Sequence, residues 1–162
     1  MKEELSGDFY DKDQIVVKFH GLYQQDDRDI REERSKKKLD RLYSFMIRLR
    51  IPGGLINSKQ WMEIHQISEN NSTGVIKITT RQTIQLHRLI KSKIKPTIQF
   101  FNLSKLDSIA TYGDMTRNVI CSSYVGKYFY EEIYGYPSKI SKMLLPKTRA
   151  YYEIWLDEEK IL

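Results

Sequence analysis

The sequence has 162 residues, a length that suits one domain or slightly more. Hydrophobic residues make up 40% and charged residues 30%, which is enough apolar material for a core and excludes a collagen-like or wholly disordered chain. Lys and Arg outnumber Asp and Glu by 27 to 21, and the single cysteine excludes an internal disulfide or a zinc or iron–sulfur site ligated by this chain's thiolates alone.

The first quarter of the chain is polar and its charges alternate in sign. We expect residues 1–14 to form a mobile tail, and Gln14–Phe19, which is rich in β-branched residues, to form a short strand before a turn at His20-Gly21. Residues 26–41 are almost all charged, which favours an exposed helix with ion pairs such as Asp27–Arg31. Residues 1–42 are therefore predicted to be a tail and a charged segment that wraps across another surface.

Strict alternation over Tyr43–Ile51 predicts a strand with an apolar face (Phe45, Ile47, Leu49, Ile51) and an outer face that carries Met46, Arg48 and Arg50. Pro52-Gly53-Gly54 predicts a tight turn. Ser58 is a suitable N-cap for a helix over residues 59–69, and one face of that helix carries Trp61, Ile64, His65 and Ser68. Residues 70–74 are expected to form a loop.

The segment Val75–Ile90 alternates again, and a bend near Arg81–Thr83 is expected to split it into two strands. One face carries Ile78, Ile84 and Leu86. The other face carries Lys77, Thr79, Arg81, Thr83, Gln85 and His87. Every member of this second face can donate hydrogen bonds and none is acidic, whereas a face selected for solubility usually mixes signs. The pattern therefore predicts an anion-binding face.

The remaining elements are less regular. A helix is expected from Lys95-Pro96, with Ile98, Phe101 and Leu106 on its apolar side, followed by a turn at residues 112–114 and a short strand, Met115–Ser122, that holds Arg117 and a buried Cys121. Residues 124–136 could be helical, Pro137 would break a helix there, and a short helix Ile140–Leu145 and a last strand Ala150–Leu156 follow. The order β-α-β-β-α with further elements predicts an α+β fold with a mixed or antiparallel sheet.

The catalytic motifs that a sequence can reveal are missing, whereas arginines recur on predicted strands. The sequence contains no glycine-rich phosphate loop, no nucleophile triad and no metal-ligand spacing among its three histidines. Arginine forks pair well with carboxylates and other oxyanions. The strand arginines Arg48, Arg50, Arg81 and Arg117 therefore favour a polyanion site, although each could instead be a surface arginine with a local acid partner.

The basic excess lies in residues 42–162, with 17 basic and 10 acidic side chains, against 10 and 11 in residues 1–41. A nucleic acid, an anionic membrane, a polyanionic small molecule or solubility alone could explain it. No apolar run approaches the roughly 20 residues of a membrane helix, and Met1–Asp13 lacks the apolar region of a secretory signal. We therefore expect a cytoplasmic location and no membrane partner.

Several segments together resemble the haemoprotein (beta) subunit of assimilatory sulfite reductase, a member of the nitrite/sulfite reductase family. They are Lys18–Arg34 (KFHGLYQQDDRDIREER), Arg48–Gly54 (RLRIPGG), Thr79–His87 (TTRQTIQLH), Asp114–Cys121 (DMTRNVIC) and Leu144–Leu156 (LLPKTRAYYEIWL). The similarity runs from about Gln14 to Leu162.

The resemblance implies a fold, an activity and a cofactor set. The fold is a ferredoxin-like half-domain over 43–112, and residues 113–162 begin a sirohaem-binding domain. The family reduces sulfite to sulfide by six electrons, in the pathway of cysteine biosynthesis, at sirohaem coupled to a four-iron cluster, and a flavoprotein (alpha) subunit supplies electrons from NADPH. By motif, Arg48 and Arg117 correspond to arginines that contact sulfite, and Lys77, Thr79, Arg81, Gln85 and His87 to residues that hold sirohaem carboxylates.

The resemblance covers no more than the opening third of the family's chain and departs from it at several points. The cluster cysteines, an active-site lysine pair and the second copy of the family's duplicated half-domain are missing; Arg88 stands where the family has Gly; and residues 123–138 drift from the family's helix. We therefore expect the chain alone to be inactive and to retain no cofactor. A non-catalytic, self-associating assembly module is the alternative hypothesis, and nucleic-acid binding ranks below both because no aromatic residues line the basic strand face.

Overall fold

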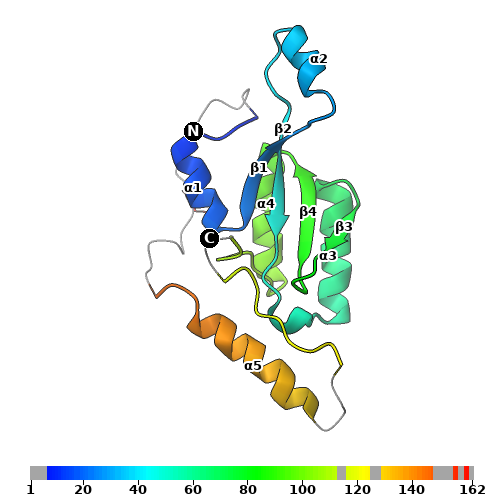
Figure 1. The fold of residues 1–162 in the computed structure, drawn as a ribbon, viewed down its shortest axis with the longest axis vertical. Coiled ribbons are helices and arrows are strands. Elements are labelled where there is room, and N and C mark those ends of the chain that lie inside the picture. The colour runs from blue at the N-terminus through cyan, green and yellow to red at the C-terminus, as the bar shows by residue number, and fades with distance from the viewer. Residues whose placement is uncertain (1–6, 113–115, 125–128, 148–154, 157–158, 161–162) are drawn as a thin grey trace.

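The structure is a computed structural model of the chain, and it describes residues 7–112, 116–124 and 129–147 together with the backbone of 155–156 and 159–160. Its centre is a four-stranded antiparallel sheet in the order β1-β2-β4-β3, made of β1 (Leu22–Asp26), β2 (Tyr43–Arg48), β3 (Ile76–Ile78) and β4 (Ile84–Leu89). Helices α3 (Ser58–Asn71) and α4 (Lys91–Leu103) lie side by side behind this sheet in Figure 1. The predicted β-α-β-β-α order and the α+β class are confirmed.

The core lies between the sheet and these two helices. The predicted apolar face of the second strand is confirmed, because Phe45, Ile47, Leu49 and Ile51 are all at most 3% exposed. They meet Ile84 and Leu86 of β4, Ile64 and Ile67 of α3, and Ile94, Ile98 and Phe101 of α4. Met46, predicted on the outer face, is buried as well. Since α3 and α4 cover the apolar side, the opposite side of the sheet is left for polar side chains.

The N-terminal prediction is wrong at two points. Gln14–Phe19 is not a strand; it belongs to helix α1 (Asp11–Phe19), which has Asp11 and Asp13 in its first turn and Lys18 in its last, and both suit a helix dipole. The expected tail also ends early, because Phe9 is buried and its ring contacts Phe45 at 4.9 Å; residues 1–6 lie outside the described part. Burial of Val17 and Phe19 outweighs the β propensity of the segment.

The polar N-terminal region contains a strand that was not predicted, and the helix expected over residues 26–41 is short. Strand β1 (Leu22–Asp26) pairs with β2, and helix α2 covers only Arg31–Lys36, projecting beyond the sheet in Figure 1 with none of its residues buried. The expected Asp27–Arg31 pair is replaced by a bidentate Arg31–Asp26 pair, whose two N···O distances are both 2.6 Å. This pair lowers the pKa of the Asp26 carboxyl.

Helix α3 begins one residue earlier than expected. Asn57, not Ser58, is its N-cap: the Asn57 side chain accepts from the Gln60 N–H at 2.8 Å, and the Gln60 side chain accepts from the Asn57 N–H at 3.1 Å. The helix also extends to Asn71, into the expected loop. Its buried face is Ile64, Ile67 and Ser68, whereas Trp61 and His65 are exposed.

Two prolines lie inside helices that were expected to start or stop at them. Helix α4 begins at Lys91, four residues before the predicted start, and includes Pro96, because Ile94, Ile98 and Phe101 anchor both sides of the proline in the core. Helix α5 (Tyr130–Met143) continues through Gly135 and Pro137 and absorbs most of the predicted Ile140–Leu145 helix. Buried Pro137 packs against Gly53, and this packing outweighs the lost N–H.

Residues 116–122 are not a strand. Arg117 has a φ of 49°, a left-handed conformation that is incompatible with a regular strand, and Cys121 is half-buried instead of a core thiol. The predicted turn at 112–114 falls on two residues outside the described part. The predicted last strand is confirmed only at β5 (Trp155–Leu156), which pairs with β6 (Glu159–Lys160), because residues 148–154 lie outside the described part.

Candidate functional site

The side of the sheet opposite α3 and α4 carries a row of polar side chains at one level. Arg48 on β2 lies directly opposite Gln85 on β4, and Gln85 lies directly opposite Lys77 on β3. Because residues opposite each other in antiparallel strands point to the same side of the sheet, these three side chains share one face, and His87 follows two residues after Gln85 on that face. We call Arg48, Lys77, Gln85 and His87 the donor row.

Arg48 is fixed by contacts with Thr111 and with Tyr23 of β1. Its Nη1 donates to the carbonyl oxygen of Thr111 at 2.9 Å and to the Tyr23 hydroxyl at 3.4 Å, and its guanidinium carbon lies 5.4 Å from the centre of the Tyr23 ring. None of these partners is a carboxylate, so the contacts orient the guanidinium without neutralising its charge. A positioned cation of this kind is suited to pair with an incoming oxyanion.

The Gln85 amide links Arg48 to His87. With its oxygen towards Arg48, the amide accepts from Nη2 at 2.8 Å and from Nε at 3.0 Å, and its nitrogen donates to His87 Nε2 at 3.1 Å. This is the orientation in which every donor meets an acceptor. It requires His87 to be neutral, with its proton on Nδ1. Burial, and then the charges of Lys77 and Arg48, lower the pKa of His87, in agreement with a neutral ring.

Arg117 acts on the same region from the loop that follows the half-domain. Burial raises the pKa of the Tyr23 phenol, while the positive charges of Arg48 and Arg117 both oppose this rise. The Tyr23 ring also lies 5.5 Å from the Tyr112 ring, over which the Lys18 ammonium sits at 5.5 Å. Three cationic side chains therefore surround this tyrosine pair, and Arg117 itself is exposed.

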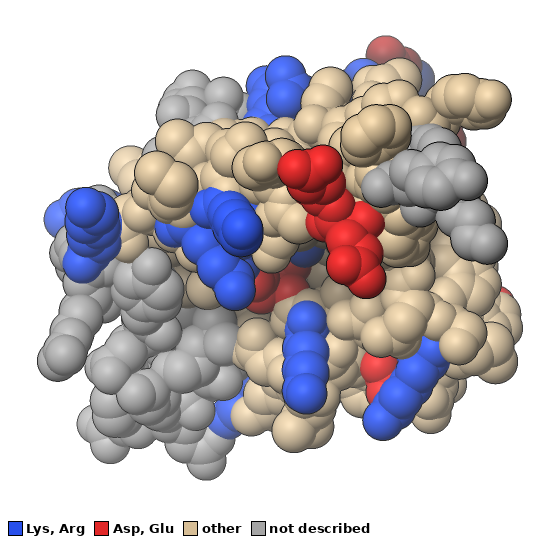
Figure 2. Space-filling view, turned by 90° about the horizontal axis from the view of Figure 1, so that it is seen from below, with Lys and Arg blue, Asp and Glu red and all other residues tan. Residues whose placement is uncertain are grey.

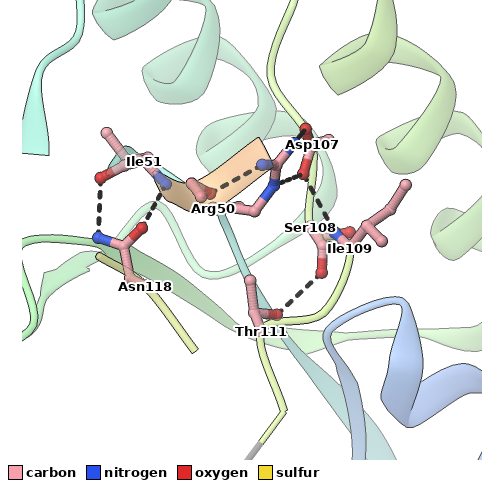
Figure 3. Close-up of polar contacts among 8 residues, drawn as sticks. Arg50, Ile51, Asp107, Ser108, Ile109, Thr111 and Asn118 are labelled. Atoms are coloured by element: carbon pink, nitrogen blue, oxygen red, sulfur yellow. Dashed lines mark hydrogen bonds and ion pairs between the residues drawn. The ribbon is translucent and has the colours of Figure 1, made fainter. Parts of the chain in front are cut away.

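Two side-chain amides hold the Arg117 loop where no strand ladder exists. Asn118 accepts from the Ile51 N–H at 3.0 Å and donates to the Ile51 carbonyl at 2.7 Å, as Figure 3 shows. The same Asn118 nitrogen donates to the Arg81 carbonyl at 2.9 Å. Gln82 pairs in the same reciprocal way with Cys121, donating at 2.7 Å and accepting at 3.0 Å. Asn118 is 4% exposed, so its two bonds to Ile51 are shielded from water.

Arg50 is separate from the donor row. Its guanidinium forms a bidentate ion pair with Asp107, with Nε to Oδ1 at 2.7 Å, and its Nη1 donates to Ser141 Oγ of α5 at 2.9 Å (Figure 3 shows the Asp107 pair). Of the four arginines predicted on strands, Arg50 is the one that an ion pair with a carboxylate satisfies among the residues that the structure describes.

Four of the seven predicted site residues lie together in the donor row. Thr79 and Arg81 lie in the turn between β3 and β4, and Arg117 lies in the later loop. Thr79 N–H donates to the Thr83 carbonyl at 2.9 Å, and Thr79 Oγ1 accepts from the Arg81 N–H at 3.3 Å. Thr83, from the predicted polar face, is buried and bonds to the Leu49 carbonyl. Arg81 is exposed at the tip of this turn. Its backbone carbonyl accepts a hydrogen bond from Asn118, and its side chain takes no part in that bond.

Sequence reasoning missed Tyr23, Thr111, Tyr112 and Asn118. The first could have been found only by recognising β1, after which its alternation with Leu22 would have placed Tyr23 beside Arg48. The other three lie in irregular segments, where periodicity gives no signal.

The described residues contain no group of three or more His, Cys, Asp and Glu side chains placed to hold a metal ion. No helix in the described part of the chain is long and apolar enough to cross a membrane. On the face seen in Figure 2, acidic side chains lie at the centre and basic ones are separated from one another around them. The described residues of that face therefore present no continuous basic surface.

Comparison with known proteins gives the same relationship by family profile, by sequence and by fold. The profile of the nitrite/sulfite reductase ferredoxin-like half domain matches residues 37–102. The sulfite reductase [NADPH] hemoprotein beta-component of Leptospira biflexa is 60% identical over 159 residues, 98% of this chain and 29% of that protein. The component of the same name from Staphylococcus haemolyticus is 48% identical over 163 residues, 100% of this chain and 28% of that protein.

Among solved structures, the Mycobacterium tuberculosis NirA protein has a TM-score of 0.64 to this chain with 22% identity, covering 81% of this chain and 25% of that one. At this identity the likeness concerns the fold alone. The chain spans less than a third of the length of the curated relatives that it matches.

Proposed function

Because this chain belongs to the nitrite/sulfite reductase family, we propose that it is the N-terminal part of a sulfite reductase haemoprotein and that its donor row holds anionic groups of the cofactor and substrate. The observation that carries the proposal is the row itself: Arg48, Gln85 and Lys77 at one level of the sheet, with His87 beside them. Within the described part of the chain, Arg48 meets a carbonyl, a phenol and an amide and no carboxylate, so its charge is available to a ligand.

The residues present fit a tetrapyrrole that carries several carboxylates. Lys77 is exposed on the edge strand, and after burial its charge and that of Arg48 are the causes that lower the pKa of His87, so both positive charges act on this surface. An anionic group would pair with these charges through charge-assisted hydrogen bonds. In this assignment Lys77, Gln85 and His87 bind cofactor carboxylates from the donor row. Thr79 and Arg81 bind cofactor carboxylates from the turn between β3 and β4.

Arg48 and Arg117 are assigned to the substrate. Both lie near Tyr23, and Arg48 is already oriented by Thr111 and Tyr23, so little ordering is needed when an oxyanion arrives. Fixed cations at this point would stabilise the negative charge of sulfite. Sirohaem coupled to a four-iron cluster would supply the electrons, and the cluster's thiolates must come from outside this sequence, which has a single cysteine.

The proposal extends to partners. The relatives are named as the beta-component of an NADPH-dependent enzyme, so the protein of which this chain is part would receive electrons from an alpha-component. The chain alone is expected to be inactive, because it lacks the cluster ligands. A chain that reduces sulfite with a chemical electron donor would contradict this expectation.

Titration of the purified chain with sirohaem, followed by visible absorption, tests the assignment. The chain should bind the cofactor weakly and less tightly at high salt, and Lys77→Met should weaken binding by about tenfold through one lost charge-assisted bond. Lys59→Met is the matched control, because Lys59 on α3 is a lysine whose side chain is 84% exposed and lies outside the donor row.

Equal affinity of the wild-type chain, Lys77→Met and Lys59→Met would contradict a role of the donor row in holding cofactor. Arg117→Met separates the substrate from the cofactor: it should remove the spectral change that sulfite causes in the sirohaem-loaded chain and leave sirohaem affinity within about twofold. An unchanged sulfite response would contradict the assignment of Arg117.

A further inference from the structure

Helix α5 carries an apolar stripe that is largely exposed among the described residues, with only the Lys139 ammonium over the Tyr136 ring, 5.9 Å from its centre. Phe129, just before the helix, Tyr136, Ile140 and Met143 are 58%, 55%, 43% and 77% exposed. Positions 129, 136 and 143 are seven apart, so they repeat on one side of the helix, and Ile140 lies one turn from Tyr136 on that side. An exposed stripe of this kind marks an interaction surface.

The helix is held to the rest of the molecule by its other side. Pro137 and Ser141 are buried, Pro137 packs on Gly53, and Ser141 accepts the hydrogen bond from Arg50. At 100° per residue, these two positions point away from the direction of Tyr136 and Met143. Docking on the stripe would therefore leave the contacts of α5 with its own chain intact.

We propose that the stripe docks a second copy of this chain, with the two α5 helices antiparallel and a twofold axis at Tyr136. This arrangement goes beyond the proposed function. Around such an axis Phe129 lies opposite Met143 of the second copy, and Tyr136 lies opposite Tyr136 of that copy, so large apolar side chains meet at the centre and at both ends of the stripe.

Charges beside the stripe select this partner and this direction. Glu132 and Lys139 flank the same side of the stripe, one turn before and one turn after Tyr136. The antiparallel arrangement therefore brings Glu132 of each copy within one residue along the axis of Lys139 of the other, which allows two equivalent ion pairs. A parallel pair would place these flanks on opposite sides of the interface, where neither ion pair can form, and it would align the two helix dipoles.

Charge reversal with mixing of variants is the decisive experiment, with sedimentation velocity of the full chain as the readout. The wild-type chain should form dimers as its concentration rises, and Glu132→Lys and Lys139→Glu should each weaken dimerisation by about tenfold, since each places like charges opposite each other twice. An equimolar mixture of the two variants should dimerise as the wild type does, because both opposite-charge pairs re-form in the mixed dimer. Glu131→Lys, on the far side of the helix from the stripe, is the matched control and should leave dimerisation unchanged.

The apolar part of the interface is tested by Met143→Asp, which should weaken dimerisation by about a hundredfold. Leu103→Asp is its control, because Leu103 is a large apolar side chain that is 84% exposed and belongs to α4 and not to α5. Circular dichroism verifies that each variant is folded. A wild-type chain that stays monomeric, or a dimer that responds to none of the α5 substitutions, would overturn the proposal.

Discussion

At the scale of single residues, the two informative histidines are both held neutral, for different reasons. His87 lies in the donor row, where burial and then the charges of Lys77 and Arg48 lower its pKa. His20 is 1% exposed at the end of α1, and among the described residues neither ring nitrogen has a hydrogen-bond partner; burial lowers its pKa to about 4. The pKa of His87 therefore reflects the charges of the donor row, whereas the low pKa of His20 links protonation of its ring to the stability of the fold.

Lys77→Met should raise the pKa of His87. The substitution removes a positive charge that disfavours protonation of the ring, and burial together with the remaining Arg48 charge keeps the pKa of His87 below its ordinary value. NMR titration of the ring protons measures the change. A fall in the His87 pKa would contradict the proposed arrangement of charges.

His20 should make the fold sensitive to mild acid. The unfolded chain binds a proton near pH 6.5, whereas the folded chain binds it only near pH 4. Stability contributed by neutral His20 is therefore complete above pH 6.5 and decreases as the pH falls towards 4, by about 3 kcal/mol in total. Urea unfolding at several pH values should show this loss in the wild type and not in His20→Leu; equal slopes in both would contradict it.

At the scale of elements, the register of β4 depends on a bulge that an arginine occupies at a conformational cost. Between the pairs Phe45–Leu89 and Ile47–Leu86, β4 has one residue more than β2, and Arg88 there has a φ of 60°. This is the left-handed region that glycine adopts without strain, which gives a physical reason for the glycine that the resembled family has at this position. Because of the extra residue, the side chains of His87 and Leu89 lie on opposite sides of the sheet although they are two residues apart.

Arg88→Gly should stabilise the chain by about 1 kcal/mol, since relief of left-handed strain exceeds the loss of a 3.5 Å ion pair with Asp27 at the surface. Arg88→Ala is the matched control: it removes the same ion pair and keeps the strain, so it should not stabilise. Thermal or urea unfolding of both variants measures the difference, and a destabilised glycine variant would contradict the prediction.

At the scale of the whole molecule, Arg50 connects three regions that are distant in sequence. Its guanidinium joins the end of β2 to Asp107 and to Ser141 of α5, and its N–H donates to the Asp107 carbonyl at 2.7 Å. Close packing continues at Gly21, which has a φ of 74°, because a Cβ at this position would collide with Thr111 Oγ1. The half-domain, the loop and α5 therefore meet around the end of β2.

Arg50→Met should destabilise the chain by about 2 kcal/mol, because Asp107 loses its partner in a half-buried place. Hydrogen exchange should show the loss of protection first in α5 and in residues 107–111, whereas Ser141→Ala should loosen α5 alone. A uniform loss of protection over the whole sheet in both variants would contradict this division of roles.

Local patterns in the sequence were enough to predict the β-α-β-β-α order and the four residues of the donor row. Alternation alone placed Arg48, Gln85, Lys77 and His87 on strands and on their correct face, because burial of one side of a sheet enforces a period of two. The motifs from Lys18 to Leu156 identified the family, which the comparisons confirm. The assignments of the site residues to sulfite and to sirohaem, the domain boundaries and the cytoplasmic location remain predictions.

Tertiary packing determined the structure of those elements whose local sequence favours a different conformation. Val17 and Phe19 form a helix because that helix covers β1, and Pro96 and Pro137 lie inside helices because packing on both sides outweighs one lost N–H. It also separated the arginines: Arg50 meets Asp107, 57 residues away, while Arg48 meets no carboxylate among the residues that the structure describes. Such pairings depend on distant segments meeting in space, and no local pattern encodes them.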